Sequence, residues 1–146
     1  MKRPDGAPQC HGGEDCLVLD MWFRATEEQL EVGYDDEDDF VSIAELPSAL
    51  QRLIDPELIV AKDREAVVIV DYPIDQPVSY AFKAASRRGF TKREIIQSIS
   101  TIYQQIYAAK GNPYGIWGHV IEDLYFGIVH LYRANGHLWI VPIVGS

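Results

Sequence analysis

The clearest hydrophobic pattern along the chain lies between residues 91 and 109. Apolar residues there recur at steps of one, three and four, so they fall on one stripe of a helix, with glutamine, serine and threonine on the opposite face. The stripe consists of Ile95, Ile96, Ile99, Ile102, Tyr103, Ile106 and Tyr107. Thr91 and Glu94 have the spacing of a capping box, which starts a helix, and Gly111 suits its end. We therefore expect an amphipathic helix over 91–109.

A second, shorter helix is predicted nearer the N-terminus. Ser42 and Glu45 have the same capping-box spacing, and an apolar stretch follows them. Pro47 is expected to interrupt this helix, because proline lacks the backbone N–H that a helix interior uses, so we expect a short turn and then a second helix start there. The helix should end near residue 54, before the Asp-Pro pair that follows.

Short apolar runs at 17–23, 58–61, 66–70 and 78–84 indicate strands. The run 66–70, Ala-Val-Val-Ile-Val, is mostly β-branched and does not alternate with polar residues. A strand with this composition is usually covered on both faces, so we expect both sides of 66–70 to be buried.

The C-terminal segment has the pattern of a β-hairpin, since Asn135-Gly136 is a preferred pair for a two-residue type I′ turn. The turn sets these opposed pairs on one face: Tyr132 and Trp139, His130 and Val141, and Ile128 and Ile143. The other face carries Val129, Leu131, Leu138, Ile140 and Pro142. Both faces are apolar, so solvent is not the natural neighbour of either. Pro142 lacks a backbone N–H and is expected at a sheet edge or a bulge.

These elements predict an α+β fold. We expect a twisted, mostly antiparallel sheet with the 91–109 helix on one face, plus a short N-terminal helix. The 146 residues fit one domain, over 17–146, preceded by a flexible arm of residues 1–16 that is rich in glycine, proline and charge.

The apolar hairpin favours self-association. The residues predicted to form the interface are Ile128, His130, Tyr132, Trp139, Val141 and Ile143. Charge supports the idea, because residues 1–75 carry a net charge of −13 and residues 76–146 a net charge of +4. Opposite charges on two halves favour contact with a complementary surface, including a second copy or an acidic partner protein.

The overall charge of −9 argues against a general nucleic-acid binder, since phosphate contacts dominate such binding. A local basic cluster leaves room for an anion or nucleic-acid site at a helix N-terminus. Its members are Lys83, Arg87, Arg88, Lys92 and Arg93. A solvated turn is the simpler interpretation, because no glycine-rich phosphate loop is present in this segment.

Two segments invite a metal hypothesis. His119, Glu122 and Asp123 would share one face of a helical turn and could serve a metal-assisted hydrolase. A structural role is the alternative, with the nearby glycines allowing tight turns and Trp117 filling the core. The N-terminal segment 10–16 holds two cysteines and one histidine, too few for a zinc site of four ligands. We expect no cofactor, and we expect the tryptophans at 22, 117 and 139 to be core residues.

The tract Gly115-Ile116-Trp117-Gly118-His119-Val120-Ile121-Glu122-Asp123-Leu124, with the helix before it, resembles uncharacterised proteins of large DNA viruses of amoebae, the marseillevirus group. The resemblance covers about the last 60 residues and has the pattern GIWGHxIxDL. It implies a virus-encoded accessory protein acting inside the host cell, and it brings no known activity or catalytic residues.

The N-terminus lacks the apolar stretch of a secretory signal, and no apolar run approaches the roughly 20 residues that cross a bilayer. We therefore expect an intracellular protein, in the cytoplasm or nucleus, that is not secreted and binds no membrane. The favoured function is a non-catalytic protein–protein interaction, with an unidentified partner protein and with itself as a homodimer. The metal-assisted hydrolase and the anion-binding module are the alternatives.

Overall fold

The structure is a computed structural model that describes residues 16–19, 23–24, 41–134 and 136–146. Its elements are, in chain order, β1 (Cys16–Leu19), α2 (Leu46–Arg52), β2 (Ile59–Ala61), β3 (Glu65–Val70), β4 (Val78–Lys83), β5 (Phe90–Thr91), α3 (Lys92–Ala108), the 3₁₀ helix η2 (Ile121–Asp123), β6 (Val129–Ala134) and β7 (His137–Pro142). The expected arm lies outside the described residues except for Cys16. No helix among these elements is long and apolar enough to cross a membrane.

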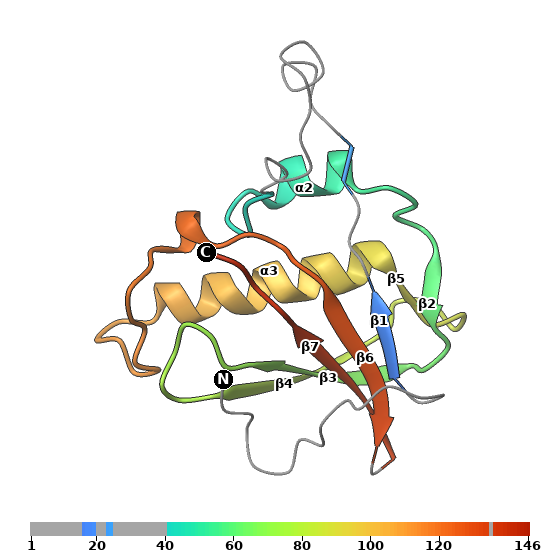
Figure 1. The fold of residues 1–146 in the computed structure, drawn as a ribbon. Coiled ribbons are helices and arrows are strands. Elements are labelled where there is room, and N and C mark those ends of the chain that lie inside the picture. Colours follow the sequence, from blue (N-terminus) through green and yellow to red (C-terminus); the bar gives the residue numbers. More distant parts are fainter. Residues whose placement is uncertain (1–15, 20–22, 25–40, 135) are drawn as a thin grey trace.

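Five strands form one twisted sheet in the order β1-β6-β7-β3-β4 (Figure 1). The pairs β1–β6, β6–β7 and β3–β4 are antiparallel, whereas β3 and β7 are parallel neighbours. β2 and β5 form a separate two-stranded ribbon. The predicted α+β fold with a mostly antiparallel sheet is therefore confirmed, with one parallel pair inside the sheet.

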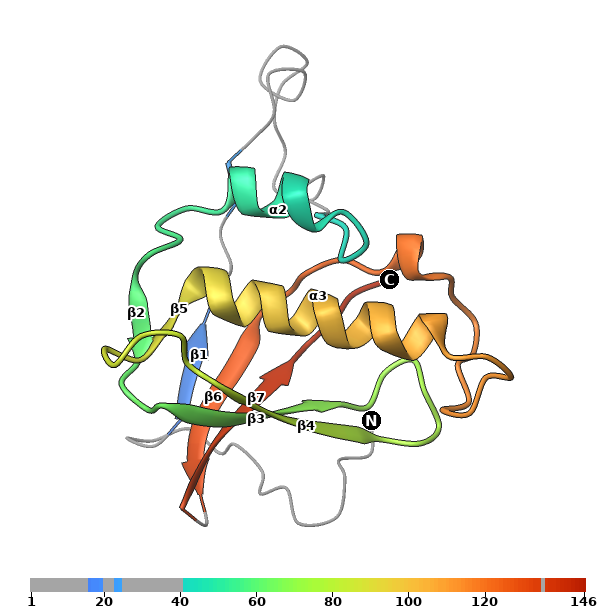
Figure 2. The ribbon, with the colours of Figure 1, turned by 180° about the vertical axis from the view of Figure 1, so that it is seen from behind.

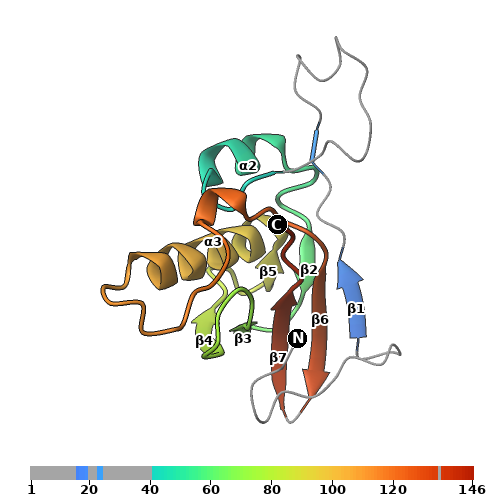
Figure 3. The same cartoon turned by 60° about the vertical axis from the view of Figure 1, so that its left-hand side comes forward.

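The long helix α3 begins as the sequence predicts. Thr91 Oγ1 accepts a hydrogen bond from the backbone N–H of Glu94 at 3.1 Å, and the Glu94 carboxylate accepts one from the backbone N–H of Thr91 at 3.1 Å. The capping box is thus complete, and the apolar stripe from Ile95 to Ile106 is buried. Figures 2 and 3 show α3 and α2 on the same side of the sheet, where they cover one of its faces.

The short helix starts later than predicted and lies mid-chain, not at the N-terminus. The residues before it form a turn at 43 and 44, in which Glu45 donates its N–H to the Ser42 carbonyl oxygen at 3.3 Å, and Ile43 donates its N–H to the Leu124 carbonyl oxygen at 3.0 Å. Ser42 therefore caps no helix, and its Oγ accepts a hydrogen bond from the Ala44 N–H at 3.2 Å, so the capping box expected there is wrong. Pro47 lies in the first turn of α2, where a helix leaves backbone N–H groups unpaired. A turn followed by a helix start at the proline is what the sequence predicts, and only the part of the predicted helix before Pro47 does not form.

The C-terminal hairpin has the predicted register. Tyr132 lies opposite Trp139, and His130 lies opposite Val141. Beyond the strands, Ile143 donates its N–H to the Ile128 carbonyl oxygen at 2.9 Å, as the same register requires. The sequence rule for the turn thus sets the pairing of two central strands.

Pro142 does not lie in an edge strand, because β7 sits between β6 and β3. The bonded pair of Ile128 and Ile143 makes the next pair, Val129 and Pro142, a non-hydrogen-bonded one. On its other side, β7 pairs with β3 only as far as Ile140. The proline therefore costs the sheet no hydrogen bond, which is why an interior strand tolerates it.

The two faces of the sheet carry separate apolar clusters. The larger one lies between sheet and helices and includes Val68 and Ile140. A smaller cluster on the opposite face centres on Ile69, Tyr132 and Val141, each at most 4% exposed. β3 contributes alternate side chains to both clusters, so the prediction that this strand is buried on both sides is confirmed.

Replacing Tyr103 with phenylalanine is expected to make the stability less sensitive to alkaline pH. Tyr103 is buried on α3, and its hydroxyl donates a hydrogen bond to the Tyr72 carbonyl oxygen at 2.7 Å. Burial, and to a smaller extent the Asp71 charge, raises the pKa of Tyr103 above its ordinary value of 10.0. The folded state binds this proton more tightly than the unfolded chain. The contribution of the protonated Tyr103 to the free energy of unfolding is therefore complete below about pH 10 and is lost as the pH rises towards the folded-state pKa.

Urea denaturation from about pH 8 to about pH 11 measures this effect. The free energy of unfolding of the wild type should fall over the upper part of the range, and that of Tyr103→Phe should fall less. At neutral pH the free energy of unfolding of the variant should also be about 1 kcal/mol lower, because the hydrogen bond from Tyr103 to Tyr72 is absent. Tyr80→Phe, which alters an exposed hydroxyl, is the control, and parallel curves for Tyr103→Phe and the wild type would contradict the prediction.

Candidate functional site

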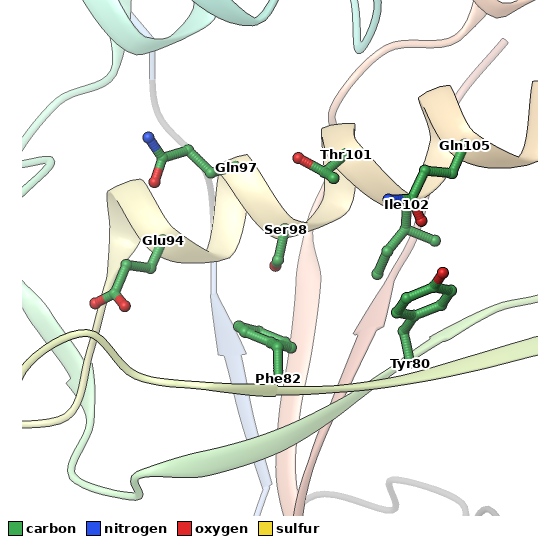
Figure 4. Close-up of a pocket in the computed structure, with 8 residues that line it drawn as sticks. All are labelled: Tyr80, Phe82, Glu94, Gln97, Ser98, Thr101, Ile102 and Gln105. Atoms are coloured by element: carbon green, nitrogen blue, oxygen red, sulfur yellow. The ribbon is translucent and has the colours of Figure 1, made fainter. Parts of the chain in front are cut away.

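A groove of about 310 Å³ runs between β4 and α3 (Figure 4). Its lining residues are Tyr80 and Phe82 from β4, and Glu94, Gln97, Ser98, Thr101, Ile102 and Gln105 from α3. The aromatic side chains of the strand point toward the helix, as Figure 4 shows. The Phe82 ring also contacts Phe90, edge to face, with ring centroids 5.0 Å apart.

The groove has an apolar floor and a polar rim in which Glu94 is the one charged residue. Phe82 and Ile102 supply the floor, while amides and hydroxyls of the helix supply the rim. Glu94 is the one carboxylate in the lining, and it is already engaged, because it accepts hydrogen bonds from the backbone N–H groups of Ala85 at 2.8 Å and Thr91 at 3.1 Å. The arrangement suits the binding of uncharged groups, which need surface contact and a few hydrogen bonds.

The groove lies beside an open edge of the sheet. β4 is the last strand in the sheet order, with β3 as its partner among the described strands. Just beyond their ladder, Ala84 donates its N–H to the Arg64 carbonyl oxygen at 2.8 Å, which marks a hydrogen-bonded pair. Bonded and non-bonded pairs alternate in an antiparallel ladder, so this contact sets the pattern along the whole of β4.

The alternation decides which backbone groups of β4 face outward. Tyr80 and Phe82 occupy bonded pairs and turn their N–H and C=O groups toward β3. Ser79, Ala81 and Lys83 occupy the intervening pairs and turn theirs toward the open edge. In the described part of the chain, no strand pairs with these outward groups.

The outer edge of β4 lacks the features that usually block strand addition. Its ladder with β3 runs through six consecutive pairs without a shift of register, so it contains no bulge. Pro77 lies before the strand, and Lys83 at its end is the only charged residue within it. Ser79, Tyr80 and Ala81 are exposed. A regular edge of this kind, whose one charged residue lies at its end, is a template for another extended chain.

A second hollow, of about 220 Å³, lies on the face of β4 away from α3. Successive side chains of a strand point to opposite faces, so Ala81 and Lys83 point away from the groove. The hollow is lined by Glu65, Ala66, Val67, Ala81, Phe82, Lys83 and His137. The same edge strand therefore has a recess on each face.

Sequence reasoning missed these residues. The available signal was a strand without charge or proline over 78–82, together with a polar helix face made of glutamine, serine and threonine. Neither pattern reveals that the two surfaces lie next to each other, because that depends on which strand ends up at the sheet edge.

The hairpin residues predicted as an interface do gather on the sheet face away from the helices. Ile128, His130, Trp139 and Ile143 are half-buried, and Tyr132 and Val141 are buried. Trp139 Nε1 donates a hydrogen bond to the Ala134 carbonyl oxygen at 2.9 Å, so the indole is anchored within its own chain. In a single chain this face of the hairpin is therefore buried at Tyr132 and Val141 and half-buried at the other four positions, and its role in self-association stays a prediction.

The predicted basic cluster is only partly assembled around the start of α3. Lys92 is buried, and its Nζ donates a hydrogen bond to the Ile54 carbonyl oxygen at 2.6 Å. Burial lowers the pKa of Lys92, and the Asp55 charge opposes part of that shift. Lys92 is thus a structural tie to the segment after α2, whereas Arg87 and Arg88 are exposed in the turn before β5.

The other two basic residues form surface ion pairs. Arg93 Nε lies 2.7 Å from a Glu57 oxygen, and Lys83 Nζ lies 3.9 Å from a Glu65 oxygen. Exposed pairs of this kind contribute little to stability, roughly 0–1 kcal/mol. They nevertheless reduce the local positive charge on which an anion site would depend.

The predicted approach of His119 and Asp123 is observed, through the 3₁₀ helix η2. His119 Nδ1 lies 3.8 Å from Asp123 Oδ2, and the Glu122 side chain is exposed. Tyr107 donates its hydroxyl proton to the His119 carbonyl oxygen at 3.0 Å, and burial, then the Asp123 charge, raises the pKa of Tyr107. In the parts of the chain that the structure describes, no three His, Cys, Asp or Glu residues are grouped to hold a metal ion.

Trp117 is not a core residue, which corrects the sequence prediction. Its side chain is 48% exposed and lies edge to face with Tyr72, at a centroid distance of 5.4 Å. The Asn112 side chain holds Ile116 through hydrogen bonds of 2.7 and 3.1 Å, and Gly118 turns the chain at a φ of 74°. These local contacts keep the tract at the surface. Trp139 is half-buried, and Trp22 lies outside the described residues.

Comparison with protein-family models, with curated proteins and with solved structures finds no match. The resemblance of the 115–124 tract to viral proteins therefore stays a prediction, and the functional argument depends on the geometry of the chain itself.

Proposed function

We propose that this chain is a non-catalytic protein-interaction module that binds an extended segment of another protein as an additional strand beside β4. The observation that carries the proposal is the set of outward-facing N–H and C=O groups of Ser79, Ala81 and Lys83, next to the groove. In strand addition, main-chain hydrogen bonds supply affinity, and pockets for alternate side chains supply specificity.

The chemistry of the groove supports binding more than catalysis. General acid–base or nucleophilic catalysis needs a reactive group that is free to contact the substrate. The lining offers amides, hydroxyls and apolar side chains, and its carboxylate, Glu94, is held by the capping box and by Ala85. We further propose, from the resemblance of the 115–124 tract, that the module is a virus-encoded accessory protein that acts in the host cell.

Replacing Ala81 with proline is expected to abolish strand addition while preserving the fold. Proline removes the outward N–H of residue 81, which the ladder with β3 does not use, and its ring obstructs an incoming strand. Proline is tolerated on edge strands where the N–H faces solvent. Ala81→Val is the matched control, because it keeps the N–H and favours extended structure.

The test uses the full chain and peptides of about ten residues selected from a random phage-displayed library, roughly the length of a long strand. Calorimetry should show that Ala81→Pro weakens the binding of the selected peptides at least about tenfold, or 1.4 kcal/mol, and that Ala81→Val does not. Amide chemical shifts of residues 79, 81 and 83 should move on binding. The proposal fails if the library yields no binder, or if the binders are insensitive to Ala81→Pro.

A further inference from the structure

We infer that the segment bound at β4 is apolar and uncharged on both of its faces, and does not alternate between apolar and polar residues. The inference rests on the proposed strand addition to β4. It concerns the side chains of the bound segment, which the backbone hydrogen bonds do not select.

The first reason is the groove on the helix side. An added strand would point every second side chain between β4 and α3, over Phe82 and Ile102. The volume of about 310 Å³ is large enough for apolar side chains of appreciable size, since ligand pockets begin at about 300 Å³. A small or strongly hydrated side chain would leave this space unfilled.

The second reason is the charge of the groove. Its carboxylate, Glu94, already accepts two backbone hydrogen bonds, and the other rim groups are neutral. A negatively charged side chain entering the groove would lose water and meet the like charge of Glu94, and a positively charged one would find only a carboxylate whose two oxygens already accept backbone hydrogen bonds. Uncharged side chains avoid this cost.

The third reason is the hollow on the opposite face. The intervening side chains of an added strand would lie over Ala81 and Val67, whose small and aliphatic surfaces line the recess of about 220 Å³. The charges at its rim belong to Lys83 and Glu65, which lie 3.9 Å apart and pair with each other. This face therefore also favours an apolar side chain, so neither face of the bound segment is expected to be polar.

A second copy of this chain fits the edge less well than a single extended segment. Antiparallel pairing of two β4 strands would bring the same faces of two sheets together, with the strands about 4.8 Å apart. A second copy would present its own β4, whose side chains on the face away from α3 are Ser79, Ala81 and Lys83 and are therefore not all apolar. We therefore commit to an extended segment of another protein.

Three synthetic peptides test the inference against the full chain. The parent peptide has valine and tyrosine at all of its central positions and solubilising lysines at its ends. In the other two, serine replaces either the odd or the even central positions. Burying one large apolar side chain is enough to change affinity by more than a factor of ten, so each serine peptide should bind at least about tenfold more weakly than the parent.

Two variants assign the faces. Thr101→Trp fills the groove and should weaken only the peptides with bulk on the helix side. Ala81→Trp fills the opposite hollow while keeping the backbone N–H, and should weaken only the peptides with bulk on that side. Both positions are exposed, so the substitutions should leave the circular dichroism spectrum unchanged.

The outcomes separate the inference from the proposed function. If a serine peptide matches the parent, or if library binders that respond to Ala81→Pro are polar on one face, the inference is overturned and strand addition stands. If no peptide responds to Ala81→Pro, strand addition itself is wrong.

Sedimentation that shows a dimer which Ala81→Pro dissociates would overturn the inference in favour of a second copy. Peptide binding that appears only after deletion of residues 1–15 would overturn it in favour of the chain's own segment.

Discussion

Replacing Gly89 with alanine is expected to lower the free energy of unfolding by about 4 kcal/mol or more, a large part of the stability of a small domain. Gly89 has a φ of 115°, where a side chain introduces strain of roughly 1–3 kcal/mol. An added Cβ would also lie 2.8 Å from the Lys62 Cα and even closer to the Ala61 carbonyl oxygen. These are backbone atoms of the β2 region, and the pairing of Ala61 with Phe90 prevents them from moving aside.

Gly111→Ala is the matched control for this prediction. Gly111 also has a positive φ, of 79°, but no atom lies within 4 Å of the position that a Cβ would occupy. The Gly111→Ala variant should therefore lose only the part of the free energy of unfolding that comes from backbone strain, about 1–2 kcal/mol. Urea denaturation of both variants, with the slope of the transition checked for two-state behaviour, measures the difference. Equal losses would show that the close approach to Ala61 has no energetic consequence.

Replacing Ile99 with alanine is expected to lower the free energy of unfolding by about 3 kcal/mol, within the usual range for such truncations in a core. Ile99 is fully buried in the middle of α3. The helix cannot move inward to fill the space, because the adjacent Ser100 hydroxyl donates a hydrogen bond to the Ile43 carbonyl oxygen at 2.8 Å and the capping box fixes the N-terminal end. The cavity is therefore expected to remain largely open.

Thr101→Ala is the control for Ile99→Ala, since it lies on the same helix with an exposed side chain. A surface change of this kind usually alters stability by less than about 0.5 kcal/mol. The two variants are compared by thermal and urea unfolding. A loss below about 1 kcal/mol for Ile99→Ala would mean that the space beside α3 closes after truncation.

The elements governed by near neighbours in the sequence could be predicted. The capping box and apolar stripe of α3 are interactions between residues three and four apart, and both are observed. The hairpin register follows from the chemistry of a two-residue turn, so the pairing of Tyr132 with Trp139 could be derived from the amino-acid sequence alone. In both cases the local preference and the final packing agree.

The errors arise where distant residues override a local preference. Ser42 has the right spacing for a cap, yet it forms a bridge with Tyr125 and Ile43 bonds to Leu124, so a turn and not a helix follows Ser42. Trp117 has the composition of a core residue, yet Asn112 and Gly118 hold its loop at the surface. A pattern of neighbours cannot reveal a partner that lies far away in the sequence.

The candidate site shows the same limit. Tyr80 and Phe82 were recognisable as strand residues, and Gln97 and Thr101 as the polar side of a helix. That they line one groove depends on β4 being the last strand of the sheet, which follows from the parallel pairing of β3 with β7. No local pattern distinguishes that pairing from an antiparallel alternative.

The strand order has a consequence for how the chain acquires its structure during synthesis. The central strands β6 and β7 follow the other strands of this sheet along the chain, yet β1 needs β6 and β3 needs β7 as neighbours, as when Ala66 pairs with Leu138. During synthesis β1 and β3 therefore lack these neighbouring strands, and β3 and β4 can pair only with each other, until the chain has been translated past residue 142. Closing such long loops slows folding, and until they close the unpaired edges of the early strands are open to aggregation.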